Sequence, residues 1–262
     1  MSTENQVSSE TTQETTTDAT APDAADSATP DATAPTAPAS PTNSLADSWE
    51  SRYAESDGVW SGKVNPTFQT TIENLDVRNT LPNGTALDLG SGEGADAIWL
   101  AQLCLKVTGV DISATATRRA TEAAAERNHA EDTTFITADL HEWLRNARKE
   151  GLTFDLITAS FLHSKPNMGT FNRDQLLRDA IELVTPGGYL VAVSHAEAPE
   201  WVGDDAFAGV TPEDELNTLQ LSETEWTVHR AEIVSRAAVG PDGAAATLQD
   251  GVFVAHRSDQ AI

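Results

Sequence analysis

The sequence is poor in cysteine, in basic side chains and in long apolar runs. Its single cysteine, Cys104, excludes an intramolecular disulfide and a cysteine metal cluster. No histidines have the spacing of a common metal motif, so we expect no metal site. No apolar run is long enough to cross a bilayer, and no basic start with an apolar core marks a signal peptide. We therefore expect a cytoplasmic protein without a membrane partner, in which Cys104 packs in the core between Leu103 and Leu105.

Basic residues are outnumbered throughout the chain. There are 16 Lys and Arg residues against 41 Asp and Glu residues, which gives a net charge of −25. A nucleic-acid-binding face and a site for anionic lipid both require clustered positive charge. The composition therefore predicts no nucleic-acid partner, and it leaves the oligomeric state open.

Residues 1–45 contain no Lys, no Arg and no aromatic residue, and are rich in Thr, Ala, Ser and Pro. Seven acids lie in this stretch, and removing them from the total of −25 leaves −18 on the rest of the chain. Such a composition does not bury enough apolar surface to offset the entropy of ordering. We expect a disordered acidic tail over residues 1–45 and a folded domain over residues 46–262.

The folded part is organised around a glycine-rich turn. An apolar run from Ala86 to Leu89 predicts a buried strand, and the run from Ala97 to Ala101 predicts a helix. Between them lie three glycines at alternate positions: Gly90, Gly92 and Gly94. A strand, a glycine turn and a helix N-terminus together let a ligand approach the bare backbone.

Acidic residues around the turn indicate the charge of that ligand. The spacing also matches the dinucleotide pattern G-x-G-x-x-G/A, which serves a pyrophosphate. However, Asp88 and Glu93 flank or enter the turn, and no Lys or Arg lies within it. Carboxylates attract a cationic ligand and repel a pyrophosphate. The charges therefore favour a cation, although the glycine spacing alone allows either ligand.

Two further predicted strands end in acids. Asp111 ends the run from residue 106, 21 residues after Gly90, where an acid can accept hydrogen bonds from both ribose hydroxyls. Asp139 ends the run from residue 133. The alternative for Asp139 is a purely structural role as the cap of a helix from Leu140 to Lys149.

These motifs resemble a known enzyme family. Asp88-x-Gly90-x-Gly92-x-Gly94, together with Pro186-Gly187-Gly188 before a later strand, is similar to class I S-adenosylmethionine-dependent methyltransferases. Trp49-x-x-Arg52-Tyr53 and Trp60-Ser61-Gly62-x-x-Asn65-Pro66 resemble small bacterial methyltransferases of the thiopurine and tellurite-resistance groups. Many relatives have Cys where Ser91 stands, a small change that should preserve the turn.

The resemblance implies S-adenosylmethionine as cofactor and assigns expected roles. An N-terminal aromatic lid over residues 46–82 would cover the methionine end of the cofactor, and packing on the core is its structural alternative. The implied cofactor-binding residues are Trp60 from the lid, Asp88, Gly90, Ser91 and Gly92 at the methionine portion, Asp111 and Ile112 at the ribose, Asp139 and Leu140 at the adenine, and Ser160 facing the donor. His163 and His195 follow two strands on the ligand side, and either is a candidate catalytic base. A structural role is the alternative for each histidine.

The order of elements predicts the fold. Alternating strands and helices predict an α/β domain with a doubly wound, Rossmann-like parallel sheet. The segments 226–238 and 251–256, joined by a Gly-Pro-Asp-Gly turn, predict an antiparallel finish. A dehydrogenase would instead need another helical crossover. The resemblance implies seven strands in the order 3-2-1-4-5-7-6.

The sequence thus predicts a methyltransferase acting on a small acceptor with a soft nucleophile such as a thiol. The acceptor pocket is expected between the lid, the loop after Ser160 and the segment from His195 to Thr211. Two alternatives remain: a cofactor-binding regulatory protein without catalysis, and a nicotinamide-dependent oxidoreductase.

Overall fold

The computed structural model describes residues 44–163, 171–197, 201, 209–240 and 242–259. The chain divides after Ser40, and all of these residues belong to the unit from Pro41 to Ile262. Nearly all of the predicted tail, residues 1–45, lies outside the described residues, as does much of the segment from His195 to Thr211. Among the helices that the structure describes, none is long and apolar enough to span a membrane.

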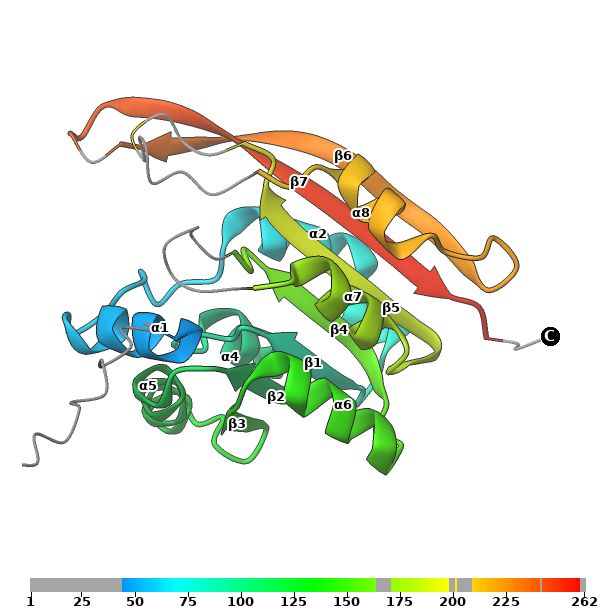
Figure 1. Ribbon diagram of the computed structural model, residues 1–262, viewed down its shortest axis with the longest axis horizontal. Helices are drawn as coiled ribbons and strands as arrows, with labels where there is room; N and C mark the ends of the chain where they lie inside the picture. The colour runs from blue at the N-terminus through cyan, green and yellow to red at the C-terminus, as the bar shows by residue number, and fades with distance from the viewer. Residues whose placement is uncertain (1–43, 164–170, 198–200, 202–208, 241, 260–262) are drawn as a thin grey trace, which may run out of the picture. The chain divides into compact units, whose positions relative to one another are not determined.

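A seven-stranded mixed sheet forms the centre of the domain (Figure 1). Its strands are β1 (Thr85–Leu89), β2 (Lys106–Asp111), β3 (Thr133–Thr137), β4 (Phe154–Ser160), β5 (Val184–His195), β6 (Trp226–Val239) and β7 (Ala245–Arg257). Their order is β3-β2-β1-β4-β5-β7-β6, and β7 alone runs antiparallel to its neighbours β5 and β6. The predicted Rossmann-like fold, strand order and antiparallel finish are therefore confirmed.

Helices cover both faces of this sheet. They are α1 (Leu45–Ala54), α2 (Pro66–Leu75), α3 (Val77–Thr80), α4 (Ala95–Gln102), α5 (Ala114–Glu126), α6 (Leu140–Glu150), α7 (Arg173–Ile181) and α8 (Pro212–Leu219). One apolar cluster joins α6 and α7 to the sheet, and a second joins α2 and α4 to it. Successive strand residues alternate between the clusters, as the period of two requires: Leu87 packs with α6 and α7, whereas Ala86 packs with α2 and α4.

Several local predictions were wrong. Cys104 is exposed rather than packed in the core, because the chain turns there with a φ of 70°. The last two strands form a longer hairpin than expected, with β7 beginning at Ala245 instead of residue 251. The Thr185-Pro-Gly-Gly segment is part of β5, which starts at Val184 with a register shift against β4.

The carboxyl ends of β1, β2, β4 and β5 meet at one edge of the sheet (Figure 1). The parallel pairing brings Asp88 of β1 beside Thr158 of β4, and Ser160 of β4 beside Val193 of β5. This edge therefore collects the residues that follow each parallel strand, as is usual for ligand sites in open α/β sheets.

Candidate functional site

The glycine turn connects β1 to α4 with its backbone in the left-handed region. Gly92 and Gly94 have φ values of 52° and 82°, which side chains rarely adopt. Space also requires glycine there. A Cβ on Gly92 would lie 2.9 Å from the Tyr53 hydroxyl oxygen, and one on Gly94 would lie 2.8 Å from the Cβ of Ala120. The turn is thus enclosed by the lid on one side and by α5 on the other.

Three carboxylates surround the turn: Asp88 and Asp111 are buried, and Asp96 is half-buried. Asp88 at the end of β1 is 2% exposed and accepts a hydrogen bond from the Thr158 hydroxyl at 2.7 Å. Asp111 at the end of β2 accepts hydrogen bonds from the backbone N–H groups of Gly92 and Ser113, both at 2.9 Å. Asp96, in the first turn of α4, accepts one from the Asn65 backbone N–H at 3.2 Å. The described site therefore concentrates negative charge where a ligand would touch the turn.

Burial changes the acidity of these carboxylates. Burial raises the pKa of Asp88 to about 7, with further increases from the nearby Asp96 and Asp111, against a lowering by the Thr158 hydrogen bond. Burial also raises the pKa values of Asp96 and Asp111. Each negative charge here is costly in the absence of a counter-charge, so a cation bound beside the three groups would be stabilised by all of them.

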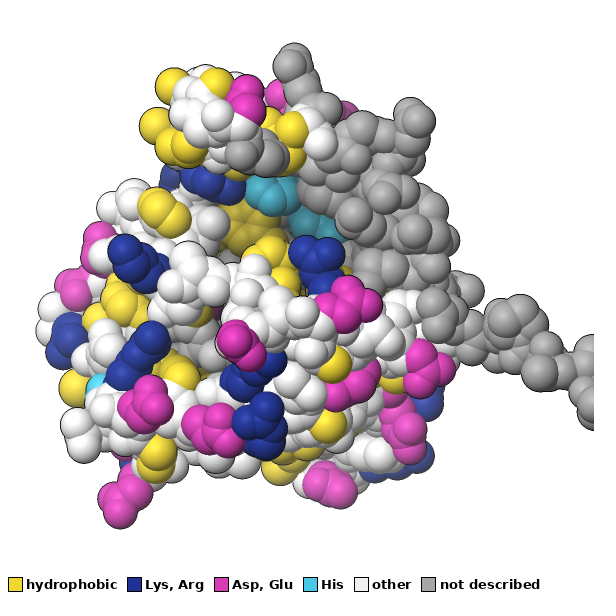
Figure 2. Space-filling view, turned by 90° about the vertical axis from the view of Figure 1, so that its left-hand side faces the viewer, with side chains coloured by type: hydrophobic (Ala, Val, Ile, Leu, Met, Phe, Trp, Pro, Cys, Tyr) yellow, Lys and Arg dark blue, Asp and Glu magenta, His cyan; other side chains and the backbone are white. Residues whose placement is uncertain are grey.

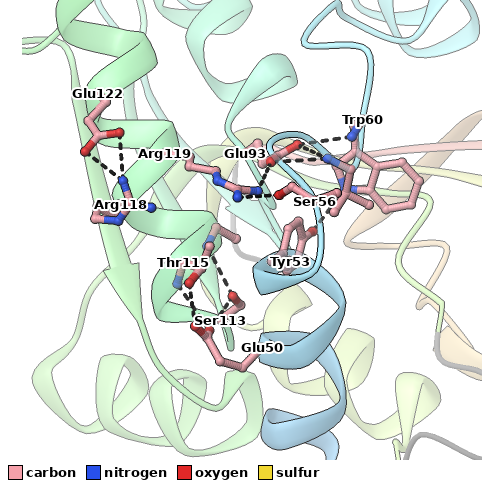
Figure 3. A network of polar contacts seen from close by, with 12 residues as sticks. Glu50, Tyr53, Ser56, Trp60, Glu93, Ser113, Thr115, Arg118, Arg119 and Glu122 are labelled. Atoms are coloured by element: carbon pink, nitrogen blue, oxygen red, sulfur yellow. Dashed lines mark hydrogen bonds and ion pairs between the residues drawn. The ribbon is translucent and has the colours of Figure 1, made fainter.

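A network of charged groups fixes the lid beside the turn (Figure 3). Glu93, within the turn, accepts hydrogen bonds from the backbone N–H groups of Val59 and Trp60, both at 3.1 Å. Arg119 of α5 donates to the same carboxylate at 2.8 Å and also donates to the carbonyl oxygen of Ser56. The acid that the sequence places in the turn therefore binds the lid, and it is not one of the three carboxylates gathered around the ligand position.

The first helix of the lid has its own attachment to α5 (Figure 3). Glu50 of α1 accepts hydrogen bonds from the hydroxyl groups of Ser113 and Thr115, at 2.6 and 2.5 Å. These bonds lower the pKa of Glu50. Because Ser113 also donates its backbone N–H to Asp111, the lid and the end of β2 share one polar network.

The lid aromatics lie directly over the turn. Trp60 donates its indole N–H to the Tyr53 hydroxyl at 3.0 Å, and Tyr53 is itself buried. Trp60 is 51% exposed, and the guanidinium of Arg52 lies 5.5 Å from its ring centroid. The structure thus brings the predicted residue Trp60 next to Gly92, as the lid hypothesis requires.

The remaining predicted cofactor residues lie around the same edge. Asp139 is exposed and caps α6 through a hydrogen bond from the Glu142 backbone N–H at 3.0 Å, so its structural alternative is realised. The buried Leu140 follows it, and the half-buried Ile112 follows Asp111. Within the described part of the chain, the Ser91 hydroxyl oxygen is buried without a hydrogen-bond partner. An unsatisfied buried hydroxyl beside a glycine turn fits a site that completes its hydrogen bonds with a ligand.

The two candidate histidines meet at the ends of β4 and β5. Their rings stack with centroids 5.8 Å apart, and the backbone N–H of His195 donates to Nε2 of His163 at 3.3 Å. Burial lowers the pKa of His163 to about 3, with smaller contributions from Arg173 and His195. Figure 2 views this edge and shows a hollow below the β6–β7 hairpin, with histidine, basic and hydrophobic side chains along it.

Other polar residues at this edge were missed by the sequence reasoning. Asp250 of β7 lies opposite His195 of β5 in the sheet, and its carboxylate accepts hydrogen bonds from Thr67 and Arg236. One signal for Asp250 was available: it interrupts the apolar face of β7 formed by Leu248, Val252 and Val254. Asp96, Glu50 and Arg119 carried no such signal, because a polar residue near a helix N-terminus or on a helix surface is ordinary. The described residues contain no group of three or more potential metal ligands.

Comparison with known proteins places the chain in a family. A family profile described as "Methyltransferase domain" matches residues 81–234. Ribosomal RNA small subunit methyltransferase C of Alcanivorax borkumensis is 29% identical over 167 residues, which are 63% of this chain and 49% of that protein. Probable thiol methyltransferase 2 of Arabidopsis thaliana is 30% identical over 146 residues, which are 55% of this chain and 60% of that protein. The chain thus matches roughly half the length of these curated relatives.

A solved structure extends the likeness over the fold. N-methyltransferase NodS from Bradyrhizobium japonicum WM9, solved in complex with S-adenosylhomocysteine, superposes with a TM-score of 0.52 at 19% identity. The match covers 82% of this chain and 99% of that one. The family profile spans more than half of this chain, and its range holds the glycine turn, the three carboxylates around it and both candidate histidines. The chain therefore belongs to the methyltransferase domain family, as the glycine-turn motif predicts.

Proposed function

We propose that the protein transfers a methyl group from S-adenosylmethionine to a small-molecule acceptor. The observation that carries this proposal is the set of three carboxylates around the glycine turn, the buried Asp88 and Asp111 and the half-buried Asp96. S-adenosylmethionine brings an ammonium and a sulfonium cation, which offset this buried negative charge. Family membership and the S-adenosylhomocysteine bound to NodS support the same cofactor.

Each residue's proposed role follows from its position. Asp88 and the turn residues Gly90, Ser91 and Gly92 hold the methionine portion, with Asp96 as an additional acid. Asp111 holds the ribose hydroxyls, because its two oxygens have acceptor capacity beyond the bonds from Gly92 and Ser113. The remaining proposed residues are Ile112, Asp139 and Leu140 along the adenosine and Ser160 towards the donor methyl. Trp60 of the lid covers the methionine end of the cofactor.

The bound cofactor supplies an activated methyl group, so the protein mainly positions the acceptor and excludes water. The lid network of Glu50, Glu93 and Arg119 keeps Trp60 and Tyr53 over the turn, as Figure 3 shows. At the ends of β4 and β5, Phe161 packs against His195 at a centroid distance of 4.5 Å. An apolar wall next to a polar group is typical of a small-molecule pocket.

A small acceptor is favoured over RNA by charge. The curated relatives include both an RNA methyltransferase and a thiol methyltransferase, so similarity alone does not decide. A net charge of −25 opposes binding to a polyanion. Thiol methylation is therefore the first activity to test.

Two alternatives make different predictions. A nicotinamide cofactor would place a pyrophosphate beside the three carboxylates, and the antiparallel β7 differs from the parallel second half expected of a dehydrogenase. A regulatory protein would bind S-adenosylmethionine without turnover.

Calorimetric titration with S-adenosylmethionine, S-adenosylhomocysteine and NADH distinguishes a methyltransferase from a nicotinamide-dependent oxidoreductase. We expect 1:1 binding of the first two and no binding of NADH, and the reverse pattern would refute the proposal. Methyl transfer from labelled cofactor to a panel of thiols, amines, phenols and RNA then tests catalysis. Turnover of RNA alone would overturn the small-molecule assignment, and binding without any turnover would favour the regulatory protein.

A further inference from the structure

The side chain of His195 is held by a buried carboxylate. Its Nδ1 lies 3.2 Å from Oδ1 of Asp250, and the Asp250 side chain is fully buried. The two residues are directly opposed on the antiparallel strands β5 and β7, so the sheet itself fixes their approach. This pair connects the last strand of the sheet to the edge where the acceptor pocket is proposed.

The other oxygen of Asp250 is committed elsewhere. Its Oδ2 accepts hydrogen bonds from the Thr67 hydroxyl at 2.7 Å and from Nε of Arg236. Burial raises the pKa of Asp250, but the hydrogen bonds from His195, Thr67 and Arg236 together lower it below its ordinary value. Asp250 is therefore a carboxylate at neutral pH, and only Oδ1 is directed at the imidazole.

This geometry selects one tautomer of His195. A carboxylate accepts but does not donate, so Nδ1 of His195 carries the proton and Nε2 carries the lone pair. His163 differs, because its Nε2 accepts the backbone N–H of His195. The low pKa of His163, about 3, agrees with a neutral ring that supports His195. The structure thus separates two histidines that the sequence left equivalent.

We propose that His195, positioned by Asp250, accepts the proton of the methyl acceptor, and that the acceptor is a neutral thiol rather than a permanently ionised anion. This inference rests on the proposed function and names the substrate class of the same site. An anion has no proton to lose, so a histidine held in one tautomer by a buried carboxylate would serve no purpose for it. A neutral thiol is a weak nucleophile until its proton is removed.

Atoms and electrons balance in this transfer. The thiol sulfur forms a bond to the donor methyl carbon while the bond from that carbon to the sulfonium breaks, and its electron pair stays on the departing sulfur as a thioether. The thiol proton moves to Nε2 of His195, and the resulting imidazolium is stabilised by Asp250. Release of that proton to water restores the neutral ring.

The charged groups around His195 come from several elements. Asp250 of β7 faces it directly, and Arg236 of β6 partly offsets that charge while its guanidinium lies 5.8 Å from the Phe161 ring centroid. His163 stacks on the imidazole, and Arg173 of α7 forms a buried ion pair with Glu215 of α8 at 2.6 Å. Because Glu215 is committed to that ion pair, Asp250 is, among the charged residues named here, the carboxylate that faces the imidazole.

The Asp250→Asn variant gives a test that does not depend on activity. Thr67 and Arg236 both donate towards Oδ2, so the amide oxygen of the substituted side chain would take that place and its NH₂ group would face His195. A donor opposite Nδ1 forces the proton to Nε2. We expect ¹⁵N NMR of the cofactor-free protein to show the Nδ1–H tautomer of His195 in the wild type and the Nε2–H tautomer in the variant. An unchanged tautomer would refute the positioning role of Asp250.

Kinetics with two thiols tests the proton transfer. An alkyl thiol such as 2-mercaptoethanol is mostly protonated at pH 7, whereas 4-nitrothiophenol is mostly ionised. We expect His195→Gln to lower kcat/KM about 100-fold for the alkyl thiol and less than threefold for the ionised thiol. Asp250→Asn should follow the same pattern. For His195→Gln, the loss with the alkyl thiol should shrink as the pH rises towards the pKa of that thiol.

Controls keep the outcomes distinct. His256→Gln changes a histidine at the other end of β5 and β7, where its ring packs against Tyr189 at a centroid distance of 4.6 Å. This variant should leave kcat/KM unchanged for both thiols. Each variant is checked for melting temperature and for S-adenosylmethionine binding by calorimetry. Absence of cofactor binding in the wild type would refute the proposed function. Normal binding with equal losses for both thiols, or with no thiol turnover at all, would refute this inference alone.

Discussion

Asp88 links protonation to stability at the scale of a single residue. Its carboxyl ionises near pH 4 when unfolded but has a pKa of about 7 in the fold, because burial and the neighbouring Asp96 oppose its charge. The folded state therefore binds more protons between these values, so stability falls as pH rises from about 4 to 7. We expect Asp88→Asn to raise the melting temperature at pH 8 and to change it little at pH 5. A parallel pH dependence in both proteins would contradict this assignment.

Because of its raised pKa, Asp88 should also release a proton when the cofactor binds. A sulfonium or ammonium placed beside Asp88 favours the carboxylate, so S-adenosylmethionine should displace a proton near neutral pH. We expect affinity to increase between pH 6 and 8. Calorimetry in phosphate and in Tris should give different binding heats, and the difference should be proportional to the number of protons released and to the difference between the ionisation heats of the two buffers. In Asp88→Asn that difference should become much smaller, and its persistence would exclude Asp88 as the source.

Asp111 is expected to affect both binding and folding. In the fold its carboxylate satisfies the backbone N–H groups of Gly92 and Ser113, which Asp111→Ala would leave buried without partners. Losing bonds to a charged acceptor should cost about 1.5–3 kcal/mol in cofactor affinity, roughly ten- to a hundredfold, together with a lower melting temperature. Calorimetry and thermal denaturation measure the two effects. Unchanged affinity would remove Asp111 from the site.

Among the elements, the loop between α1 and α2 depends on one carboxylate. Glu93 holds the backbone of Val59 and Trp60 and pairs with Arg119 in a largely buried setting (Figure 3). We expect Glu93→Gln to speed hydrogen exchange at these two amides and to weaken cofactor binding several-fold. Glu122→Gln is the matched control, because Glu122 pairs with Arg118 on the exposed face of α5, the helix that carries Arg119. This variant should change neither the hydrogen exchange at the two amides nor the cofactor affinity. Equal effects of both variants would show that Glu93 does not specifically hold the loop.

Element-scale prediction succeeded where the sequence period was strong. The runs from Ala86, from residue 106 and from residue 133 predicted β1, β2 and β3, and the hairpin turn predicted the antiparallel finish. Two features had no local signal. The extension of β7 back to Ala245 depends on pairing with β6 rather than on hydrophobicity, and α3 is a single turn after the left-handed Asp76. Long-range strand pairing and short helices depend on tertiary contacts, and the hydrophobic periodicity of a segment carries no information about those contacts.

At the scale of the whole molecule, the N-terminal boundary can be refined. The structure shows Ser44 as the N-cap of α1, with a capping box to Asp47. Deleting residues 1–42 should leave the melting temperature and cofactor affinity unchanged, whereas deleting residues 1–45 removes the cap and should cost about 1 kcal/mol. Thermal denaturation of the two truncated proteins checks this. If the shorter deletion destabilised the domain, the composition argument for residues 1–45 would be wrong.

The candidate site was predictable in one half and not in the other. Residues proposed for the cofactor, such as Asp88 and Asp111, lie at the ends of strands at fixed distances from the glycine turn, so local motifs predict them. The residues proposed for the acceptor side come from α2, β5, β6 and β7, and the contact between Thr67 and Asp250 spans 183 residues of sequence. No motif links such distant positions. His195 was identified only as a residue after a strand, and its partner emerged from the sheet pairing.

That contact also orders events during synthesis. The glycine turn and the acids at the ends of β1 and β2 leave the ribosome first, and Asp250 emerges long after them, on a strand that inserts between β5 and β6. A nascent chain therefore contains the residues proposed for the cofactor well before Asp250 can hold His195 in place. Because β7 contributes to both the central sheet and the His195 contact, the proposed catalytic pair and the completed sheet form with the same strand.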